Sequence, residues 1–295
     1  MTQNSQLLLI EPHDRDLGGG FMVRRVLPSA LKPSLGPFVF FDHFGPVTSK
    51  PGDNHDVRPH PHIGLATVTY LFEGASMHRD STGAVQRIEP GAINLMTAGR
   101  GIVHSERAPE ELHGVSHVSH GLQLWVALPE DREEEEPHFQ HVAASRLLAV
   151  DVNGASVRVL AGSAFGVDSL VEVASPTLFV DMQLPAGAQL EMPAAYSERG
   201  LYSVDSPFEV DGQVVPPFKL VILEAGTKPM LSTPTGGHVV LLGGEPLGKR
   251  FLYWNFVSSR KERLVQAADD WKAQRFPTVP SDDKEFIPLP DRKLG

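Results

Sequence analysis

Residues 60–74 read HPHIGLATVTYLFEG, which places two histidines directly before an alternating strand. Side chains at positions i and i+2 of a strand project from the same face, so His60 and His62 can point into one cavity. The alternating segment that follows, residues 67–73, ends at Gly74, as expected for a strand that ends in a turn. This segment favours a β-rich fold that carries a polar site.

The same spacing recurs in residues 97–106, which read TAGRGIVHSE and offer His104 and Glu106. Glycines 99 and 101 permit a sharp turn before this second strand. If the two strands face each other, three imidazoles and one carboxylate converge. That set suits a divalent first-row metal, iron(II) first, with manganese, nickel, copper or zinc also compatible. Four protein ligands on a six-coordinate metal leave two positions open, as a reactive centre requires.

Composition excludes several classes of protein. The 295 residues include no cysteine, so disulfides and zinc–thiolate sites are excluded and any metal must be held by nitrogen and oxygen. The net charge of −10 and the absence of a basic cluster argue against direct nucleic-acid binding. The N-terminus does not read as a signal peptide, and no apolar run reaches the ~20 residues that span a bilayer. We therefore expect a cytoplasmic protein without a membrane partner.

Glycine and proline are plentiful, 27 and 25 residues, which favours many short strands joined by turns. The acidic run Glu133 to Glu136, followed by Pro137, predicts a solvated connector between two domains, 1–135 and 136–295. Ser259 to Glu262 predicts a capping box that begins a helix, and Pro277 ends that helix. The tail from Asp282 to Gly295 is expected to be irregular surface chain.

A histidine pair followed some forty residues later by a third histidine resembles the cupin superfamily. Cupins usually place a glutamate shortly after the first pair, but Ala66 and Thr67 stand there and cannot ligate well, so Glu106 takes that role. This departure, together with HPHIGLATVTYLFEG, TAGRGIVHSE, GLQLW (121–125) and GGEPL (243–247), resembles the pirin family. The resemblance extends from about Phe38 to Phe276.

The resemblance implies an all-β bicupin: two stacked antiparallel β-barrels and a short C-terminal helix. It implies one metal, held in the N-terminal barrel by His60, His62, His104 and Glu106, and none in the C-terminal barrel. It also implies quercetin 2,3-dioxygenase activity, in which O2 opens the ring of a flavonol, a small aromatic substrate, and carbon monoxide is released. The alternative is a non-enzymatic regulator, linked to the metal or its redox state, that acts on a protein partner as a transcription co-regulator or enzyme regulator.

In the enzyme interpretation, Glu106 is also the catalytic base for the substrate hydroxyl. Gln123 would hydrogen-bond a ligand if the leucines of its strand pack in the core; the reverse orientation is also open. His43 is a candidate for the pocket mouth. Candidate pocket walls, each also compatible with plain core, are Phe38, Phe40, Met96 and Trp125.

The remaining histidines receive structural interpretations. His113, His117 and His120 are interpreted as a solvated loop cluster in preference to a second metal site. We expect His78, His138 and His141 to lie at the surface.

Overall fold

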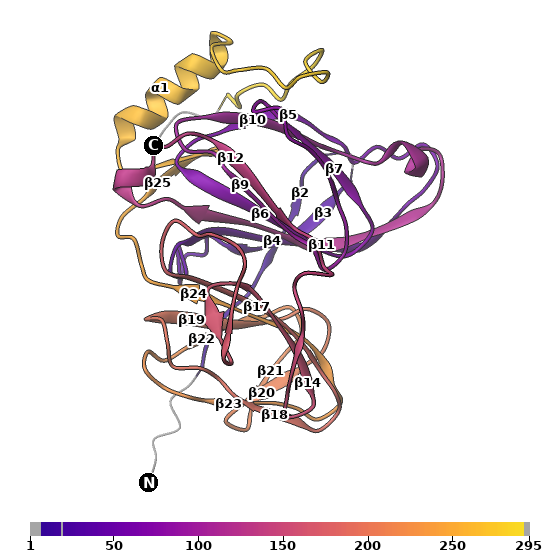
Figure 1. The fold of residues 1–295 in the computed structure, drawn as a ribbon, viewed down its shortest axis with the longest axis vertical. Coiled ribbons are helices and arrows are strands. Elements are labelled where there is room, and N and C mark those ends of the chain that lie inside the picture. Colours follow the sequence, from indigo (N-terminus) through magenta and orange to yellow (C-terminus); the bar gives the residue numbers. More distant parts are fainter. Residues whose placement is uncertain (1–6, 19, 292–295) are drawn as a thin grey trace. The chain divides into compact units, whose positions relative to one another are not determined.

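The computed structural model describes residues 7–18 and 20–291. Residues 1–6, where no signal peptide is expected, and residues 292–295 of the tail lie outside the described part. The fold is mostly β, with one α-helix, α1 (Lys261–Lys272), near the C-terminal end (Figure 1). The predicted all-β class with a short C-terminal helix is thus confirmed. Within the described residues, no helix has the length and apolar character needed to cross a bilayer.

The chain forms two compact units, each built from separate stretches of sequence. The first unit comprises Met1–His13, Arg25–Phe40 and Ser145–Pro246; the second comprises Asp14–Arg24, Phe41–Ala144 and Leu247–Gly295. This differs from the expected division into 1–135 and 136–295. The physical reason lies in the C-terminal stretch, where Phe256, Leu264 and Trp271 pack in one core cluster with Ile63 and Val103.

The second unit contains two sheets, and His60, His62 and His104 lie on strands of the smaller one. A seven-stranded sheet has the order β12-β9-β6-β11-β4-β3-β2, and a four-stranded sheet has the order β5-β10-β7-β8. The chain passes between the units within β3 and β4. The strands of the larger sheet are β2 (His13–Asp16), β3 (Met22–Leu27), β4 (Phe38–Ser49), β6 (Leu65–Glu73), β9 (Ile93–Thr97), β11 (His117–Ala127) and β12 (His138–Val142). Those of the smaller sheet are β5 (Val57–His62), β7 (Ser76–Asp80), β8 (Val85–Ile88) and β10 (Ile102–Arg107).

The first unit repeats this plan, with a seven-stranded sheet in the order β1-β22-β19-β24-β17-β14-β13 and a four-stranded sheet in the order β18-β23-β20-β21. Buried side chains of both sheets, such as Leu190, Phe208 and Leu241, share one core. The larger sheet consists of β1 (Leu8–Ile10), β13 (Val150–Val152), β14 (Ala155–Ala161), β17 (Thr177–Leu184), β19 (Glu198–Ser203), β22 (Leu220–Leu223) and β24 (Gly237–Gly244). The smaller sheet consists of β18 (Ala188–Glu191), β20 (Phe208–Val210), β21 (Gln213–Val215) and β23 (Met230–Thr233).

The expected barrels are not closed. In residues 7–18 and 20–291 each unit keeps two separate sheets, and no strand ladder joins one sheet to the other. Each unit therefore buries its core between two sheets, as double-sheet β folds do. The remaining elements are two hairpins and two short 3-10 helices: β15 (Ser163–Ala164) with β16 (Val167–Asp168), β25 (Phe251–Tyr253) with β26 (Phe256–Ser258), η1 (Glu110–Leu112) and η2 (Glu130–Arg132).

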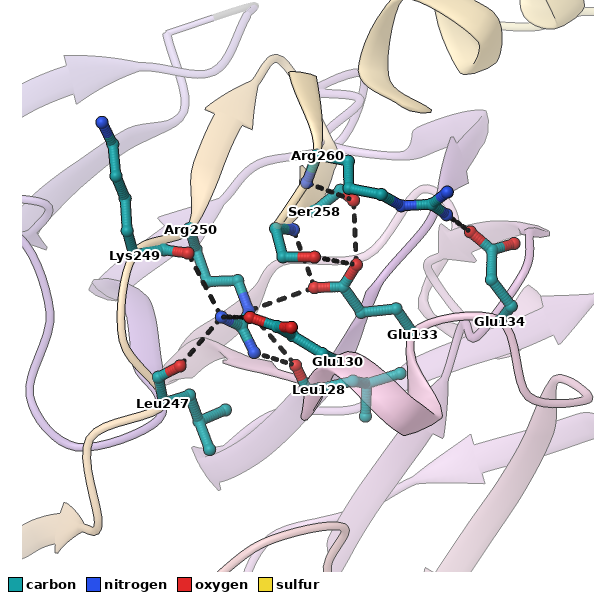
Figure 2. Close-up of polar contacts among 10 residues, drawn as sticks. Leu128, Glu130, Glu133, Glu134, Leu247, Lys249, Arg250, Ser258 and Arg260 are labelled. Atoms are coloured by element: carbon teal, nitrogen blue, oxygen red, sulfur yellow. Dashed lines mark hydrogen bonds and ion pairs between the residues drawn. The ribbon is translucent and has the colours of Figure 1, made fainter. Parts of the chain in front are cut away.

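The acidic run is not a solvated connector, because its first residue, Glu133, is buried. Figure 2 shows the polar contacts that Glu133 makes. The Glu133 carboxylate accepts hydrogen bonds from Ser258 Oγ at 2.9 Å and from the Ser259 backbone N–H at 2.8 Å. It also forms an ion pair with Arg250 Nε at 3.1 Å. Both charged side chains are almost fully buried, 3% and 5% exposed. Glu133 thus ties η2 to the segment that leads into α1.

The predicted capping box is wrong for the same reason. The Ser259 hydroxyl lies 3.0 Å from a Glu133 carboxylate oxygen and is directed there instead of to the first turn of α1. The residue at the N-cap position is Arg260, which makes no side-chain capping hydrogen bond. The sequence pattern identified the start of the helix to within a residue or two, but a buried carboxylate from a distant segment captured the serine.

The described part of the tail, residues 282–291, is irregular and mostly exposed, as expected, but Asp282 and Ile287 are bonded to strands of the second unit. Asp282 accepts a hydrogen bond from Ser105 Oγ at 2.7 Å and two from the Arg107 guanidinium at 2.7 Å each. The Ile287 backbone N–H donates to Pro59 O at 2.8 Å. The tail therefore contacts β10 and β5 next to the histidines that these strands carry.

We expect Asp282→Ala to lower the free energy of unfolding by about 1.5–3 kcal/mol, the usual contribution of hydrogen bonds to a charged group. Chemical denaturation followed by tryptophan fluorescence measures this loss. The exposed neighbour Asp283 provides the control. Equal unfolding midpoints for Asp282→Ala and Asp283→Ala would show that the tail contact contributes nothing.

Candidate metal centre

The two histidine-bearing strands pair side by side in the four-stranded sheet. β10 is antiparallel to β5, with His104 opposite His60 and Ile102 opposite His62. The turn before β10 depends on Gly99, whose φ is +49° and where an added Cβ would lie 2.0 Å from Glu135 O. The predicted glycine turn is confirmed at this position, since a larger residue would collide with that backbone.

The three imidazoles form a compact group. Their ring centroids lie 4.3 Å apart for His60 and His104, and 5.0 Å apart for each of the other two pairs. One ring nitrogen from each histidine falls in a set whose members all lie within 4.8 Å of one another. Nitrogen ligands about 2 Å from a shared ion are separated from each other by distances of this order, so the group can hold one metal.

Burial keeps the three rings neutral. His60, His62 and His104 are 6%, 1% and 1% exposed. Burial lowers the pKa of His60 to about 4, and it lowers the pKa of His62 and His104 well below the ordinary value, with help from the neighbouring imidazoles. A metal ligand must be an unprotonated imidazole, so these groups are ready to bind a cation at neutral pH.

Hydrogen bonds orient the ring nitrogens. His60 Nδ1 lies 2.9 Å from Arg58 O, and His62 Nδ1 lies 3.1 Å from Asn255 O. A carbonyl oxygen only accepts, so each Nδ1 carries the proton and each Nε2 keeps its lone pair. His104 Nε2 is buried and has no hydrogen-bond partner within the described residues. A metal ion would supply the missing partner of His104 Nε2 and could also bind the Nε2 lone pairs of His60 and His62. The three residues therefore fit the expected metal.

Glu106 lies next to this group but is not one of its members. A register shift separates it from His104, because Glu106 pairs with Val57 where a regular ladder would offer Arg58. Its Oε1 lies 3.4 Å from Thr69 Oγ1, whose single proton is directed more closely to Gln123 Oε1 at 2.9 Å. Burial raises the pKa of the Glu106 carboxyl. The hydrogen bond from Thr69 to the Glu106 carboxyl is long and shared with Gln123.

A cavity of about 390 Å³ reaches this position. Its lining includes Glu106, Gln123 and Thr69, but none of the three histidines. Apolar and aromatic side chains form much of the rest: Leu17, Phe21, Phe44, Val57, Leu71, Leu112 and Val115. Polar and charged side chains, among them Lys50, Asp53 and Arg107, make up most of the remainder, and a cavity of this size and mixed lining can hold a small molecule.

Of the other predicted pocket residues, only Gln123 lines the cavity. Gln123 lines the cavity while Leu122 and Leu124 are buried, so the inward of the two orientations is the observed one. His43 is fully buried and does not line the cavity. Its Nε2 lies within hydrogen-bond distance, 2.8 Å, of Nε2 of His120. The four candidate walls, Phe38, Phe40, Met96 and Trp125, are buried core and do not line the cavity.

The expected histidine environments are corrected in part. His113 and His117 line the cavity, and within the described residues no second group of three possible ligands exists. His138 and His141 are half-buried. The prediction that His78 lies at the surface is wrong, because it is only 3% exposed and contacts His104. Its hydrogen bond to Asp80 has the same i, i+2 spacing as the ligand pairs, and that spacing is the signal that sequence reasoning missed.

Comparisons with known proteins identify the family of this chain. The Pirin family profile matches residues 20–126, and the profile of the Pirin C-terminal cupin domain matches residues 179–277. A pirin-like protein of Caulobacter vibrioides is 45% identical over 96% of this chain and 99% of its own. The chain belongs to the pirin family.

Further relatives support the same assignment. Human pirin is 32% identical over 90% of this chain and 91% of its own length. The crystal structure of a quercetin 2,3-dioxygenase from Acinetobacter baumannii superposes with a TM-score of 0.89 at 34% identity, covering 99% of this chain and 98% of that one. The bicupin fold of this family member is therefore established, with two cupin domains and sheets that stay open.

Proposed function

We propose that this pirin family member is a metal-dependent dioxygenase that acts on flavonol-type substrates, opening the ring with O2 and releasing carbon monoxide. The observation that carries the proposal is the cavity of about 390 Å³ that Glu106 lines, two residues along β10 from His104 of the buried histidine group. A metal site sealed from any cavity would instead favour the regulator that acts through a protein partner. The similarity to the Acinetobacter quercetin 2,3-dioxygenase supports the same choice of substrate class.

His60, His62 and His104 would hold one divalent ion, iron(II) first, in the second unit, and Glu106 would turn to it as the fourth ligand. The first unit would hold none. A bound first-row metal supplies Lewis acidity and a redox centre for chemistry with dioxygen. Fixed Nδ1 hydrogen bonds keep two of the imidazoles in the orientation that presents Nε2. Little reorganisation is then needed when the ion binds.

Glu106 would also accept the proton of the flavonol hydroxyl at a carboxylate oxygen. Its raised pKa brings it nearer to the range in which a carboxylate is an effective base. Thr69 and Gln123, already hydrogen-bonded to each other, offer polar contacts to the oxygens of the substrate. Phe21, Phe44 and the neighbouring aliphatic side chains would enclose a flat aromatic ring and keep water away.

The test is the loss of flavonol absorbance with iron-loaded protein under air. We expect Glu106→Ala and His104→Ala to lower the rate by about 100-fold or more, the usual effect of losing a general base or a metal ligand. Carbon monoxide should appear in step with substrate loss. Equal turnover in the wild type and both variants, at matched metal content, would exclude the dioxygenase as described.

A further inference from the structure

We infer that His78 and Asp80 are positioning residues that fix the proton of His104 on Nδ1 and so present its Nε2 lone pair to a metal. The inference rests on the metal site of the proposed function, but not on the flavonol reaction. His60 and His62 are held by backbone carbonyls, which no side-chain replacement removes. For His104, the corresponding partner is a side chain, so its orientation depends on residue identity.

The three residues form a continuous buried row. β7 lies beside β10, with Asp80 opposite His104 and His78 opposite Glu106. His104 Nδ1 is 3.4 Å from His78 Nδ1, and His78 Nε2 is 2.9 Å from Asp80 Oδ2. The exposed fractions of His104, His78 and Asp80 are 1%, 3% and 0%. Because water does not reach these atoms, they have to satisfy one another.

Asp80 determines which atoms of the row donate hydrogen bonds and which accept them. Its other oxygen, Oδ1, accepts hydrogen bonds from Thr82 N at 2.9 Å, Thr82 Oγ1 at 2.6 Å and Ala84 N at 3.2 Å. Burial alone would raise the pKa of the Asp80 carboxyl, but the hydrogen bonds from His78 and Thr82 hold it below its ordinary value. An ionised carboxylate only accepts. The ring nitrogen that faces it, His78 Nε2, must therefore donate.

The rest follows from the number of protons on each ring. An imidazole with one proton on Nε2 has a lone pair on Nδ1, so His78 Nδ1 accepts. The nitrogen that faces it, His104 Nδ1, then carries the proton of that ring. His104 Nε2 is left as the lone pair, and this is the buried atom without a partner in the described residues. The stacked ring of Phe139, 4.4 Å from that of His78, keeps the His78 plane in place.

Asp80→Asn reverses the donor and acceptor roles along the row, and the side chain keeps almost the same size and shape. Its amide oxygen can still accept from Thr82 and Ala84, while its NH2 group donates to His78 Nε2. His78 Nδ1 then becomes the donor, and the proton of His104 moves to Nε2, where it blocks the metal. We expect the dissociation constant for cobalt(II) or nickel(II) to rise by about 10- to 100-fold, the usual effect of losing such an outer partner.

The matched control is Asp181→Asn in the first unit, which alters a buried aspartate–histidine pair with His238. The constant for each protein is measured by chelator competition, and the cobalt absorption spectrum reports the ligand geometry. Unfolding temperatures separate a folding defect from a ligand defect. We expect the control to keep the wild-type metal constant and spectrum.

A second pair of variants does not depend on Asp80. His78→Gln can donate to Asp80 with its NH2 group and accept from His104 with its oxygen, so it should retain metal binding. His78→Leu removes the acceptor and should weaken it by a similar 10- to 100-fold. If Asp80→Asn fails to fold, this pair decides the question.

Wild-type affinity and spectrum in Asp80→Asn, or equal affinity in His78→Gln and His78→Leu, would overturn the inference and leave the dioxygenase standing. Tight metal binding by the wild type without flavonol turnover would exclude the dioxygenase and leave the inference about His78 and Asp80 standing.

Discussion

Replacing His62 with alanine should remove most of the metal from the purified protein while the fold stays intact. One of four ligands is lost, and a quarter of a binding free energy on the order of 12 kcal/mol corresponds to a loss of affinity of roughly 100-fold or more. The fold should survive because the core of the first unit and the helix-side core of the second are built from other side chains. Elemental analysis of protein made without a metal-binding tag gives the metal content, and circular dichroism checks the fold.

His13→Ala is the control for this experiment, since His13 is an exposed strand histidine away from the metal group. It should keep the metal content of the wild type. Full occupancy in His62→Ala would mean that the metal is held elsewhere. Loss of metal in His13→Ala as well would point to nonspecific binding by surface histidines.

Glu133→Ala should produce the largest loss of stability among the charged-residue variants. It removes the nearer and buried carboxylate from the Arg250 guanidinium, which is only 5% exposed, and it removes the acceptor for two serines (Figure 2). Breaking one side of a buried ion pair costs about 3–5 kcal/mol, because the remaining charge stays desolvated. Arg250 keeps its hydrogen bonds to Leu128 O and Leu247 O, which do not neutralise it, and a long ion pair of 3.9 Å with Glu130, which is 74% exposed and so compensates little.

Its neighbour Glu134 provides a matched control in the same acidic run. Glu134 is 44% exposed and pairs with Arg260 at 3.2 Å and Arg263 at 2.8 Å. Exposed pairs of this kind contribute about 1 kcal/mol or less. Urea titrations of the two variants should therefore differ clearly in their midpoints. Similar midpoints would show that Glu133 is solvated after all, as the sequence suggested.

The contrast between these glutamates shows where sequence reasoning stops. The run of acidic residues followed by proline reads as solvated chain, because nothing local offers a partner to Glu133. Its partners, Arg250 and the serines at 258 and 259, come from a stretch more than a hundred residues later. Long-range pairing of this kind leaves no periodic signal. The same return of the chain directs Ser259 away from the predicted capping box and places the C-terminal stretch in the unit that holds His60.

The metal group could be predicted because its signal is local. Residues two apart on a strand share one face, so the rule predicted that His60 and His62 point the same way, and the structure brings a ring nitrogen of His104 within 4.8 Å of theirs. It was incomplete for Glu106, since the register shift on β5 separates that residue from the ladder that aligns the histidines. The same rule applies to His78 and Asp80, which are also two residues apart on a strand, β7. That strand was not among those predicted to carry ligands.

An anomalous-diffraction map of metal-loaded crystals tests the central claim most directly. It should show a single ion in the second unit, at about 2.0–2.2 Å from one ring nitrogen of each of the three histidines and from an oxygen of Glu106. The Nδ1 atoms of these rings should keep their present partners. An ion at any other position, or an empty histidine group in protein that contains stoichiometric metal, would contradict it.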